Sequence, residues 1–348
     1  MRYVRLGRTD LEVSVIALGC GNFGGIGSVP ELFGQGEDEQ AAFVLMDAAR
    51  EHGITLFDTA NSYGGGRSEA AVGRWLASRG ARDEVVLTTK VRNRVGPGPG
   101  DEGLSARHIR EQIEASLRRL GTDRIDLYLA HEPDPSVPIS ETMAAFDELI
   151  RSGKVRHAGL SNYDGEQVLA AVDAASAGGL AGPVNLQDSY SLLDRDAAGT
   201  FGVCAAHGIG FTAYSPLAGG WLSGKYRAGQ PYPRGSRMSL RPDPYRDLEQ
   251  PATFAALDEL ERAAGERGVS LAALGLAWVL TDPGVTAMIV GPRRPEQLAP
   301  AIEALDLDLA HDERAALTRI AAGELGLQAE ASRPSCIGID SAGMGRPK

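Results

Sequence analysis

The chain has 348 residues, of which 43% are hydrophobic and 23% charged, and its formal net charge is -11 at pH 7. This balance is typical of a globular protein with a large core and excludes disordered and collagen-like chains, while the negative charge argues against nucleic acid or an anionic membrane as a partner. The cysteines Cys20, Cys204 and Cys336 lie far apart without metal-ligand spacing, so we expect no disulfide framework, no metal site and a reducing, cytoplasmic location. No run approaches the roughly 18 apolar residues of a membrane helix, so we expect no membrane span.

Short apolar runs alternate with amphipathic stretches along the chain, which predicts strands that are each followed by a covering helix. Eight runs are predicted as strands, at residues 15–18, 55–57, 85–88, 125–129, 155–159, 184–186, 210–213 and 287–290. Helices are predicted at residues 39–51, 105–120, 140–151, 166–175 and 253–266. Eight alternations favour a closed (β/α)8 TIM barrel of the α/β class, because each right-handed crossover places the next strand beside the last until the sheet closes.

Three segments stand outside this alternation. Residues 3–15 are predicted to form a β-hairpin that plugs the barrel floor, and residues 218–251, rich in proline, glycine and arginine, to form a long functional loop after the seventh strand. The end of the chain has no periodicity, which predicts a flap or a disordered segment. No linker divides the chain, so we expect a single domain over residues 1–322 and a tail over residues 323–348.

Polar residues follow most of the predicted strands. They are Asp58, Lys90, His131, Ser161 with Asn162, Gln187 and Tyr214, and Gly291 follows the last strand. In a parallel barrel all strands end on one face, and that face holds the active site in characterised barrel enzymes. We therefore expect these residues to meet at one mouth of the barrel.

Tyr63 is the candidate proton donor for reduction of a carbonyl group, because negative charge develops on the oxygen as a hydride reaches the carbon. A free tyrosine has a pKa of about 10, so a nearby cation is needed to lower it, and Lys90 can supply that charge. Asp58 would hold the lysine, and His131 would orient the carbonyl oxygen or share the proton relay. Taken singly, each residue also fits a structural role, such as an ion pair or a packed tyrosine.

Three segments around these residues resemble the signatures of the aldo-keto reductase family. The segments are Phe57-Asp58-Thr59-Ala60-Asn61-Ser62-Tyr63-Gly64, Thr89-Lys90 and Asp126-Leu127-Tyr128-Leu129-Ala130-His131. The resemblance continues through Gly159-Leu160-Ser161-Asn162 and Tyr214-Ser215-Pro216-Leu217-Ala218-Gly219-Gly220, and it covers roughly residues 2–305. It implies NADPH-dependent reduction of an aldehyde or ketone, with Asp58, Tyr63, Lys90 and His131 as the catalytic residues.

The resemblance also implies how NADP(H) would be bound. The nicotinamide would contact Gly21, Asn22, Asp58, Ser161, Asn162 and Gln187, with Tyr214 stacked on its ring. The pyrophosphate would lie on the turn of Ser215, Pro216, Leu217 and Gly219, beside Lys225. The 2′-phosphate and adenosine would contact Arg237, Gly291, Arg293 and Gln297. The chain departs from the family at Pro300 and Ala301, where Glu and Asn are frequent, and this leaves the adenine contacts open.

The substrate itself is not identified by these patterns. Phe23, Tyr63, His131 and Trp221 are candidate substrate contacts, and the walls of the pocket are expected from the loops at residues 92–103 and 218–251 and from the tail. Two other functions stay open: an NADPH-binding regulatory or sensor subunit with little turnover, and a barrel isomerase or lyase acting on sugar phosphates. Arg293 and its neighbour Arg294 could also be surface arginines without a ligand. The oligomeric state is likewise open.

Overall fold

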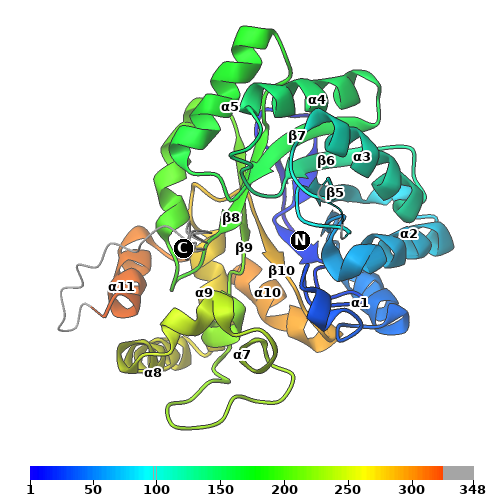
Figure 1. Cartoon of the computed structure of the whole chain (residues 1–348). Helices are drawn as coiled ribbons and strands as arrows, with labels where there is room; N and C mark the ends of the chain where they lie inside the picture. The colour runs from blue at the N-terminus through cyan, green and yellow to red at the C-terminus, as the bar shows by residue number, and fades with distance from the viewer. Residues whose placement is uncertain (97, 99, 324–348) are drawn as a thin grey trace, which may run out of the picture.

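Eight parallel strands close into a barrel in the computed structural model, which describes residues 1–96, 98 and 100–323 (Figure 1). The barrel order is β10-β3-β4-β5-β6-β7-β8-β9. The strands are β3 (Ile16–Gly19), β4 (Leu56–Asp58), β5 (Val86–Val91), β6 (Ile125–Ala130), β7 (Val155–Ser161), β8 (Asn185–Ser189), β9 (Gly210–Tyr214) and β10 (Ala287–Val290). The predicted (β/α)8 barrel is confirmed. The predicted tail, apart from Gly323, lies outside the described residues.

Helices surround the barrel on its outer side (Figure 1). They are α1 (Glu39–Glu51), α2 (Arg67–Arg79), α3 (Ala106–Leu120), α4 (Ile139–Arg151), α5 (Gly165–Gly178), α6 (Phe201–Ala206), α7 (Arg237–Leu240), α8 (Pro251–Glu266), α9 (Leu271–Leu280), α10 (Ala299–Glu303) and α11 (His311–Ala321). Local chemistry sets several starts, because the side chains of Asp38, Ser105 and Asp164 accept hydrogen bonds from the first turns of α1, α3 and α5. The prediction for α1 matches the structure at both ends.

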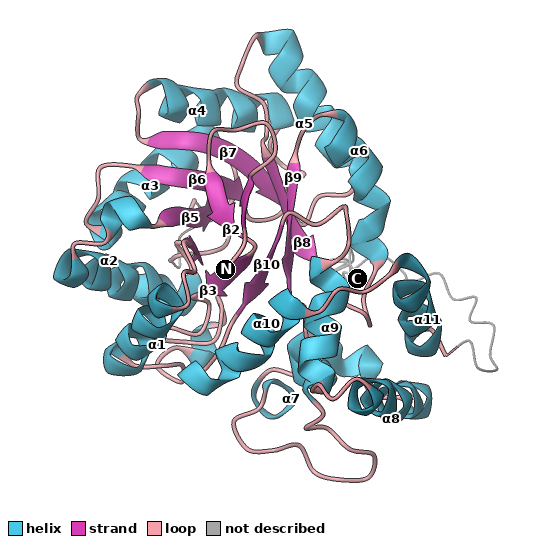
Figure 2. Cartoon of the chain, turned by 180° about the vertical axis from the view of Figure 1, so that it is seen from behind, coloured by secondary structure: helices cyan, strands magenta, loops and turns pink. Residues whose placement is uncertain are grey.

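The predicted N-terminal hairpin is also present, as strands β1 (Tyr3–Arg5) and β2 (Glu12–Ser14) (Figure 2). Leu6, Leu11 and Val13 are buried in one cluster with barrel side chains such as Leu127 and Leu129. Gly7 has a φ of 53°, and a Cβ there would lie 2.6 Å from the Gly208 carbonyl oxygen. The hairpin is therefore seated closely on the barrel floor, as the sequence predicted.

The long segment after β9 contains short helical turns that the sequence did not predict. They are the 3-10 turns η5 (Ala218–Ser223) and η6 (Asp243–Leu248), with α7 between them. Within the described residues, no single helix is long and apolar enough to cross a membrane, and only α8 and α9 pass that test together, as a pair bent by 89°. The same residues hold no group of three or more His, Cys, Asp or Glu side chains that could bind a metal ion.

Candidate active site

The barrel strands carry the candidate catalytic side chains to one end of the barrel. Asp58 is the last residue of β4 and pairs with Thr88 of β5. Lys90 lies inside β5, because this strand runs to Val91 rather than ending at residue 88 as predicted. Side chains two residues apart in a strand share a face, so Lys90 points to the same side of β5 as the partner of Asp58. His131 directly follows β6, and its backbone N–H donates to Val91 O at 2.9 Å.

The Lys90 ammonium group is enclosed and contacts three oxygen acceptors. Its Nζ donates to Asp58 Oδ1 at 2.5 Å, to the Thr59 carbonyl at 2.9 Å and to the Tyr63 hydroxyl at 3.3 Å. These acceptors use all three donors of an ammonium group, and the side chain is 0% exposed. Burial lowers the pKa of Lys90, but the charges of Asp58 and Tyr63 and their hydrogen bonds outweigh burial and raise it above its usual value. Lys90 is therefore a fixed cation that faces the Tyr63 oxygen.

The pKa of the Tyr63 hydroxyl is raised above its usual value, so the hydroxyl is protonated at neutral pH. Burial raises the pKa of Tyr63, and the charge of Lys90 offsets that rise only in part. The net shift is opposite to the lowering expected from the sequence, because the ammonium is already paired with Asp58 and the buried surroundings disfavour phenolate. A general acid must hold its proton until it is needed, and a raised pKa satisfies that requirement.

The imidazole of His131 faces the same hydroxyl and is neutral. Its Nε2 lies 3.4 Å from the Tyr63 oxygen. Burial, followed by the positive charges of Lys90 and Arg92, holds the pKa of His131 well below its usual range. The other ring nitrogen, Nδ1, lies 3.4 Å from the Asn93 amide nitrogen. An amide N–H donating to Nδ1 leaves the ring proton on Nε2, where it can be donated to a carbonyl oxygen beside Tyr63.

The residues predicted around the nicotinamide carboxamide also come together beside this group. They are Ser161 and Tyr214, the last residues of β7 and β9, Asn162, which follows β7, and Gln187, inside β8. Asn162 adopts a left-handed φ of 61°, its Nδ2 donates to His131 O at 2.7 Å, and its Oδ1 accepts from the Tyr214 hydroxyl at 2.7 Å. Gln187 Nε2 donates to Asp58 Oδ2 at 2.8 Å. The predicted nicotinamide residues and the candidate catalytic residues thus form one hydrogen-bonded network.

The turn predicted to hold the pyrophosphate has an unusual backbone and is covered by a tyrosine. Ser215, Ala218 and Gly219 have positive φ values of 53°, 47° and 64°. The Tyr245 hydroxyl lies 2.7 Å from Ser215 Oγ, and a Cβ on Gly219 would lie 2.5 Å from the Tyr245 ring. The same turn contains the remaining predicted residues, Pro216 and Leu217. Glycine is therefore needed at position 219 both for its backbone conformation and for the contact with Tyr245.

Three cations predicted to bind phosphates lie near one another, on the segments after β9 and β10. The pKa of Lys225 is lowered by burial and then by the charges of Arg237 and Arg293, and the pKa of Arg237 is lowered by burial and by Arg293 among other groups. In the part of the chain that the structure describes, neither Lys225 nor Arg237 forms an ion pair with a carboxylate. Arg237 Nη2 instead donates to Asn22 Oδ1 at 3.4 Å, and Arg293 pairs with the buried Glu37.

Two further predicted cofactor residues have local roles. Gln297 is exposed, and its Oε1 accepts from the Arg293 backbone N–H at 2.7 Å, so the side chain predicted to contact adenosine stabilises the turn after Gly291. Gly21 lies against the ring of Tyr63, because a Cβ there would be 3.6 Å from that ring. Gly21 thus borders the catalytic group.

Phe23 and Trp221, the aromatic side chains predicted to contact the substrate, are buried in the structure. Both side chains are 0% exposed. Trp221 packs among the rings of Tyr226, Tyr232 and Phe254. Burial favours a packing role for both side chains, and contact with a substrate stays a prediction. Large aromatic side chains bury the most apolar area, and core packing satisfies that tendency here.

Sequence reasoning assigned no role to Glu37 or Asn93. Glu37 stands in the acidic run Glu37-Asp38-Glu39 before α1, where no pattern distinguishes it from an ordinary helix start. Asn93 lies three residues after Lys90, at the start of a loop predicted as a substrate wall. Only its place beyond the end of β5 could have indicated contact with His131.

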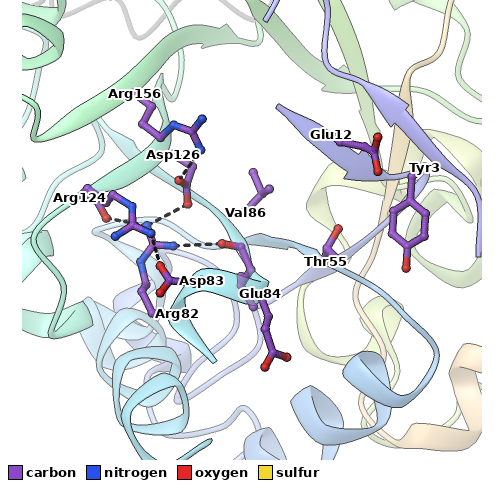
Figure 3. A pocket seen from close by; sticks show the side chains of 11 residues that line it. Tyr3, Glu12, Thr55, Arg82, Asp83, Glu84, Val86, Arg124, Asp126 and Arg156 are labelled. Carbon is purple, nitrogen blue, oxygen red and sulfur yellow. Dashed lines mark hydrogen bonds and ion pairs between the residues drawn. The ribbon is translucent and has the colours of Figure 1, made fainter. Parts of the chain in front are cut away.

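A pocket of about 210 Å³ lies at the other end of the barrel, near the hairpin (Figure 3). Arg82 Nη2 lies 2.9 Å and Arg156 Nη1 lies 3.5 Å from the buried Asp126 carboxylate. Arg124 pairs with Asp83 at 2.5 Å. Each arginine is thus paired with a carboxylate, which gives these residues a structural role in holding the strand starts together.

An acidic pocket of about 430 Å³ is lined in part by Asn162, a member of the hydrogen-bonded network described above. Its lining includes Asp188, Asp194 and Asp196. Burial raises the pKa of Asp188 to about 6, and the negative charges of Asp194 and Asp196 add to that rise. Asp188 is still mostly ionised at neutral pH, but its charge costs more free energy in the folded protein than in the unfolded chain.

Comparison with known proteins agrees with this geometry. The model of the Aldo/keto reductase family matches residues 15–322. The chain is 40% identical to the Uncharacterized oxidoreductase YrpG of Bacillus subtilis, over 89% of this chain and 92% of that protein. It is 35% identical to a Probable voltage-gated potassium channel subunit beta of Arabidopsis thaliana, over 88% and 92%, and 33% identical to the L-glyceraldehyde 3-phosphate reductase of Escherichia coli O157:H7, over 94% of both. The chain therefore belongs to the aldo/keto reductase family and is an NAD(P)H-dependent oxidoreductase.

Proposed function

We propose that the protein reduces an aldehyde or ketone to an alcohol by direct hydride transfer from NADPH, with Tyr63 as the general acid. The observation that carries the proposal is the position of the Tyr63 hydroxyl, 3.3 Å from Lys90 Nζ and 3.4 Å from His131 Nε2. A carbonyl oxygen beside this hydroxyl would meet an O–H donor and a neutral N–H donor, with a fixed cation behind them. This is the set of groups that a developing alkoxide requires.

Each residue of the network has a distinct part in the proposed reaction. NADPH, when bound, supplies the hydride. The substrate oxygen accepts hydrogen bonds from Tyr63 and His131, and Tyr63 gives up its proton as negative charge grows on that oxygen. Lys90 then stabilises the phenolate that remains, so it acts when charge develops rather than by lowering the pKa beforehand. Asp58 holds the ammonium in place, and Gln187 binds the second carboxylate oxygen.

The residues present fit a phosphorylated dinucleotide. Lys225 and Arg237 have no carboxylate partner among the described residues, so their charges are available to phosphate oxygens. The left-handed turn at Ser215 and Gly219 leaves the backbone open to close approach once the Tyr245 ring moves aside. Ser161, Asn162 and Gln187 would hold the carboxamide beside the catalytic network.

The proposed enzyme acts as a single domain over residues 1–322, on a small-molecule carbonyl compound in the cytoplasm. The relative from Escherichia coli is named a reductase of L-glyceraldehyde 3-phosphate. A phosphorylated aldehyde is therefore the first substrate to test, together with aromatic aldehydes, sugar-derived ketones and pyridoxal-like compounds. The oligomeric state stays an open question.

The Tyr63→Phe variant tests the proposal. Turnover should fall by about 10²–10⁴-fold, because the proton donor is lost, while the Kd for NADP+ measured by calorimetry stays near that of the parent protein. Tyr3→Phe is the matched control, since Tyr3 is 45% exposed and its hydroxyl bonds only to Gly53 O. Undiminished turnover in Tyr63→Phe would overturn the assignment of the general acid.

A second candidate function is a regulatory subunit that binds NADPH with little turnover. Relatives named as potassium channel beta subunits favour it. The two functions separate in one assay, which follows NADPH oxidation across a varied panel of carbonyl compounds. Tight cofactor binding without turnover of any of them would favour the regulatory subunit.

A further inference from the structure

Glu37 is a buried carboxylate among the cations of the proposed phosphate site. Its side chain is 5% exposed, although it precedes α1 in a run of otherwise exposed acidic residues. Glu37 Oε1 accepts a hydrogen bond from Arg293 Nε, while Oε2 is buried and has no hydrogen-bond partner in the structure. A buried carboxylate oxygen without a partner is costly, and each such atom in a native protein calls for an explanation, such as a functional role.

The contacts of Arg293 link three segments of the barrel mouth. Its Nε bonds Glu37 from the β3–α1 loop, and its Nη1 donates to Gly235 O at 2.8 Å, in the segment after β9. The neighbouring Arg237 reaches Asn22 of the same β3–α1 loop at 3.4 Å. Arg293 is thus the one cation of the predicted phosphate ligands that already has an anionic partner among the described residues.

Two cations, Arg293 and Arg237, affect the pKa of the Glu37 carboxyl group. Burial raises the pKa of Glu37, whereas the hydrogen bond and charge of Arg293 and the charge of Arg237 lower it, and burial prevails. The carboxylate is therefore only partly compensated by its surroundings. A dianionic phosphate is a stronger partner for a guanidinium group than this carboxylate, because it offers more charge and more acceptor oxygens.

We propose that Glu37 is a specificity-determining residue: it occupies Arg293 in place of the cofactor 2′-phosphate and thereby reduces the preference for NADPH over NADH. This inference rests on the proposed function, since it requires a nicotinamide dinucleotide at the barrel mouth. A 2′-phosphate that binds the Nε edge of Arg293 displaces Glu37 from it and then lies close to the released carboxylate, which repels it. NADH carries a hydroxyl at that position, so its binding leaves the Glu37–Arg293 pair intact.

The Glu37→Gln variant tests the inference with NADP+ and NAD+ as the probes. The amide keeps the size of the side chain but removes the negative charge, so the Kd for NADP+ should fall by about tenfold, while the Kd for NAD+ changes little. Calorimetry on the full-length protein measures both constants, and thermal melting checks that the variant is folded. Glu39→Gln is the matched control, because Glu39 is two residues away, is 49% exposed and pairs with Arg74.

Arg293→Gln and the double variant show whether the effect passes through Arg293. Arg293→Gln should weaken NADP+ binding and leave NAD+ binding nearly unchanged, and the gain from Glu37→Gln should shrink in the Glu37→Gln/Arg293→Gln protein. An equal gain for NADP+ and NAD+ in Glu37→Gln would overturn the inference, because it would assign Glu37 to the pyrophosphate instead. An unchanged ratio of the two constants would overturn it as well.

Failure of this inference is distinguishable from failure of the proposed function. If the parent protein binds neither NADP+ nor NAD+, the proposed function fails together with the inference. If it binds both and turns over a carbonyl compound, but Glu37→Gln leaves their ratio unchanged, only the role of Glu37 is refuted. Should Glu37→Gln fail to fold, Arg293→Gln alone decides, because unchanged NADP+ binding in that variant contradicts the inference.

Discussion

At the catalytic mouth, Lys90 makes three hydrogen bonds to fixed oxygen atoms, whereas in the proposed cofactor groove Lys225 and Arg237 have no carboxylate partner among the described residues. The first group stands on strand ends and the second on the long segments after β9 and β10. The Tyr245 ring also lies against the Gly219 turn, where the pyrophosphate is proposed to bind. The difference teaches that the candidate catalytic group is held rigidly, while the proposed cofactor binding would require the Tyr245 ring to move.

The largest effect is expected from Lys90→Met, which removes the three hydrogen bonds of the Lys90 ammonium group. Asp58 would keep a buried charge without its cation, so the free energy of unfolding should fall by about 3–5 kcal/mol. Turnover should be nearly abolished at the same time. Denaturant titration and a carbonyl-reduction assay measure the two effects.

The Asp58→Asn/Lys90→Met protein is the control for that variant. Removing the stranded charge should restore part of the stability and none of the turnover. A single Lys90→Met variant as stable as the parent would show that the mouth is not held by this ion pair.

A stabilising change should come from Asp188→Asn in the acidic pocket. Because the folded pKa of Asp188 is raised to about 6, its contribution to stability is complete below the unfolded pKa of about 4 and is lost as the pH rises through 6. The variant should therefore exceed the parent at pH 8, by up to about 3 kcal/mol, and lose that advantage near pH 4. The exposed Asp173→Asn is the control in the same melting series; equal gains at both pH values would refute the assignment.

The Arg237→Gln variant tests the role of the cations that have no carboxylate partner among the described residues. Loss of one phosphate contact should weaken NADP+ binding by about tenfold, and the effect should shrink at high salt. The turnover number at saturating cofactor should stay unchanged, since Arg237 does not contact the catalytic network. Arg234→Gln, an exposed neighbour in the same loop, should bind NADP+ like the parent. A lower turnover number with unchanged NADP+ affinity would contradict this prediction, because it would assign Arg237 to catalysis instead of phosphate binding.

The smallest effect is expected from Trp221→Phe. Trp221 is buried among other aromatic side chains, so a smaller ring should lower the free energy of unfolding by about 1–2 kcal/mol. The KM for the substrate should not change. A shifted KM across several carbonyl compounds would restore the predicted role in substrate binding.

The barrel could be predicted from the sequence because each strand and helix has its own periodicity. The meeting of the candidate catalytic residues at one end of the barrel could be predicted for a related reason: the end of a strand fixes where Asp58 and His131 emerge. Lys90 was placed just after its strand, since periodicity does not reveal that β5 continues to Val91. Element boundaries depend on long-range pairing, which a local pattern does not contain.

The pKa of Tyr63 and the partner of Arg293 could not be predicted in the same way. Both depend on burial and on contacts between segments that are distant in the chain, such as Glu37 and Arg293. Trp221 illustrates the same limit, because a tryptophan in a long loop is compatible with either a pocket or a core. Its burial follows from how η5 packs against α8 and α9.

The pairing of the first and last barrel strands, β3 and β10, has a consequence for biosynthesis. β3, the first strand of the barrel, pairs with β4 on one side and with β10 on the other, as Met288 opposite Ile16 shows. While the chain is being made, the outer edge of β3 has no partner until almost the whole sequence has left the ribosome. Such a strand edge is a template for wrong pairing, and joining distant strands is slow. A nascent chain stalled before residue 287 would therefore expose its first barrel strand to aggregation.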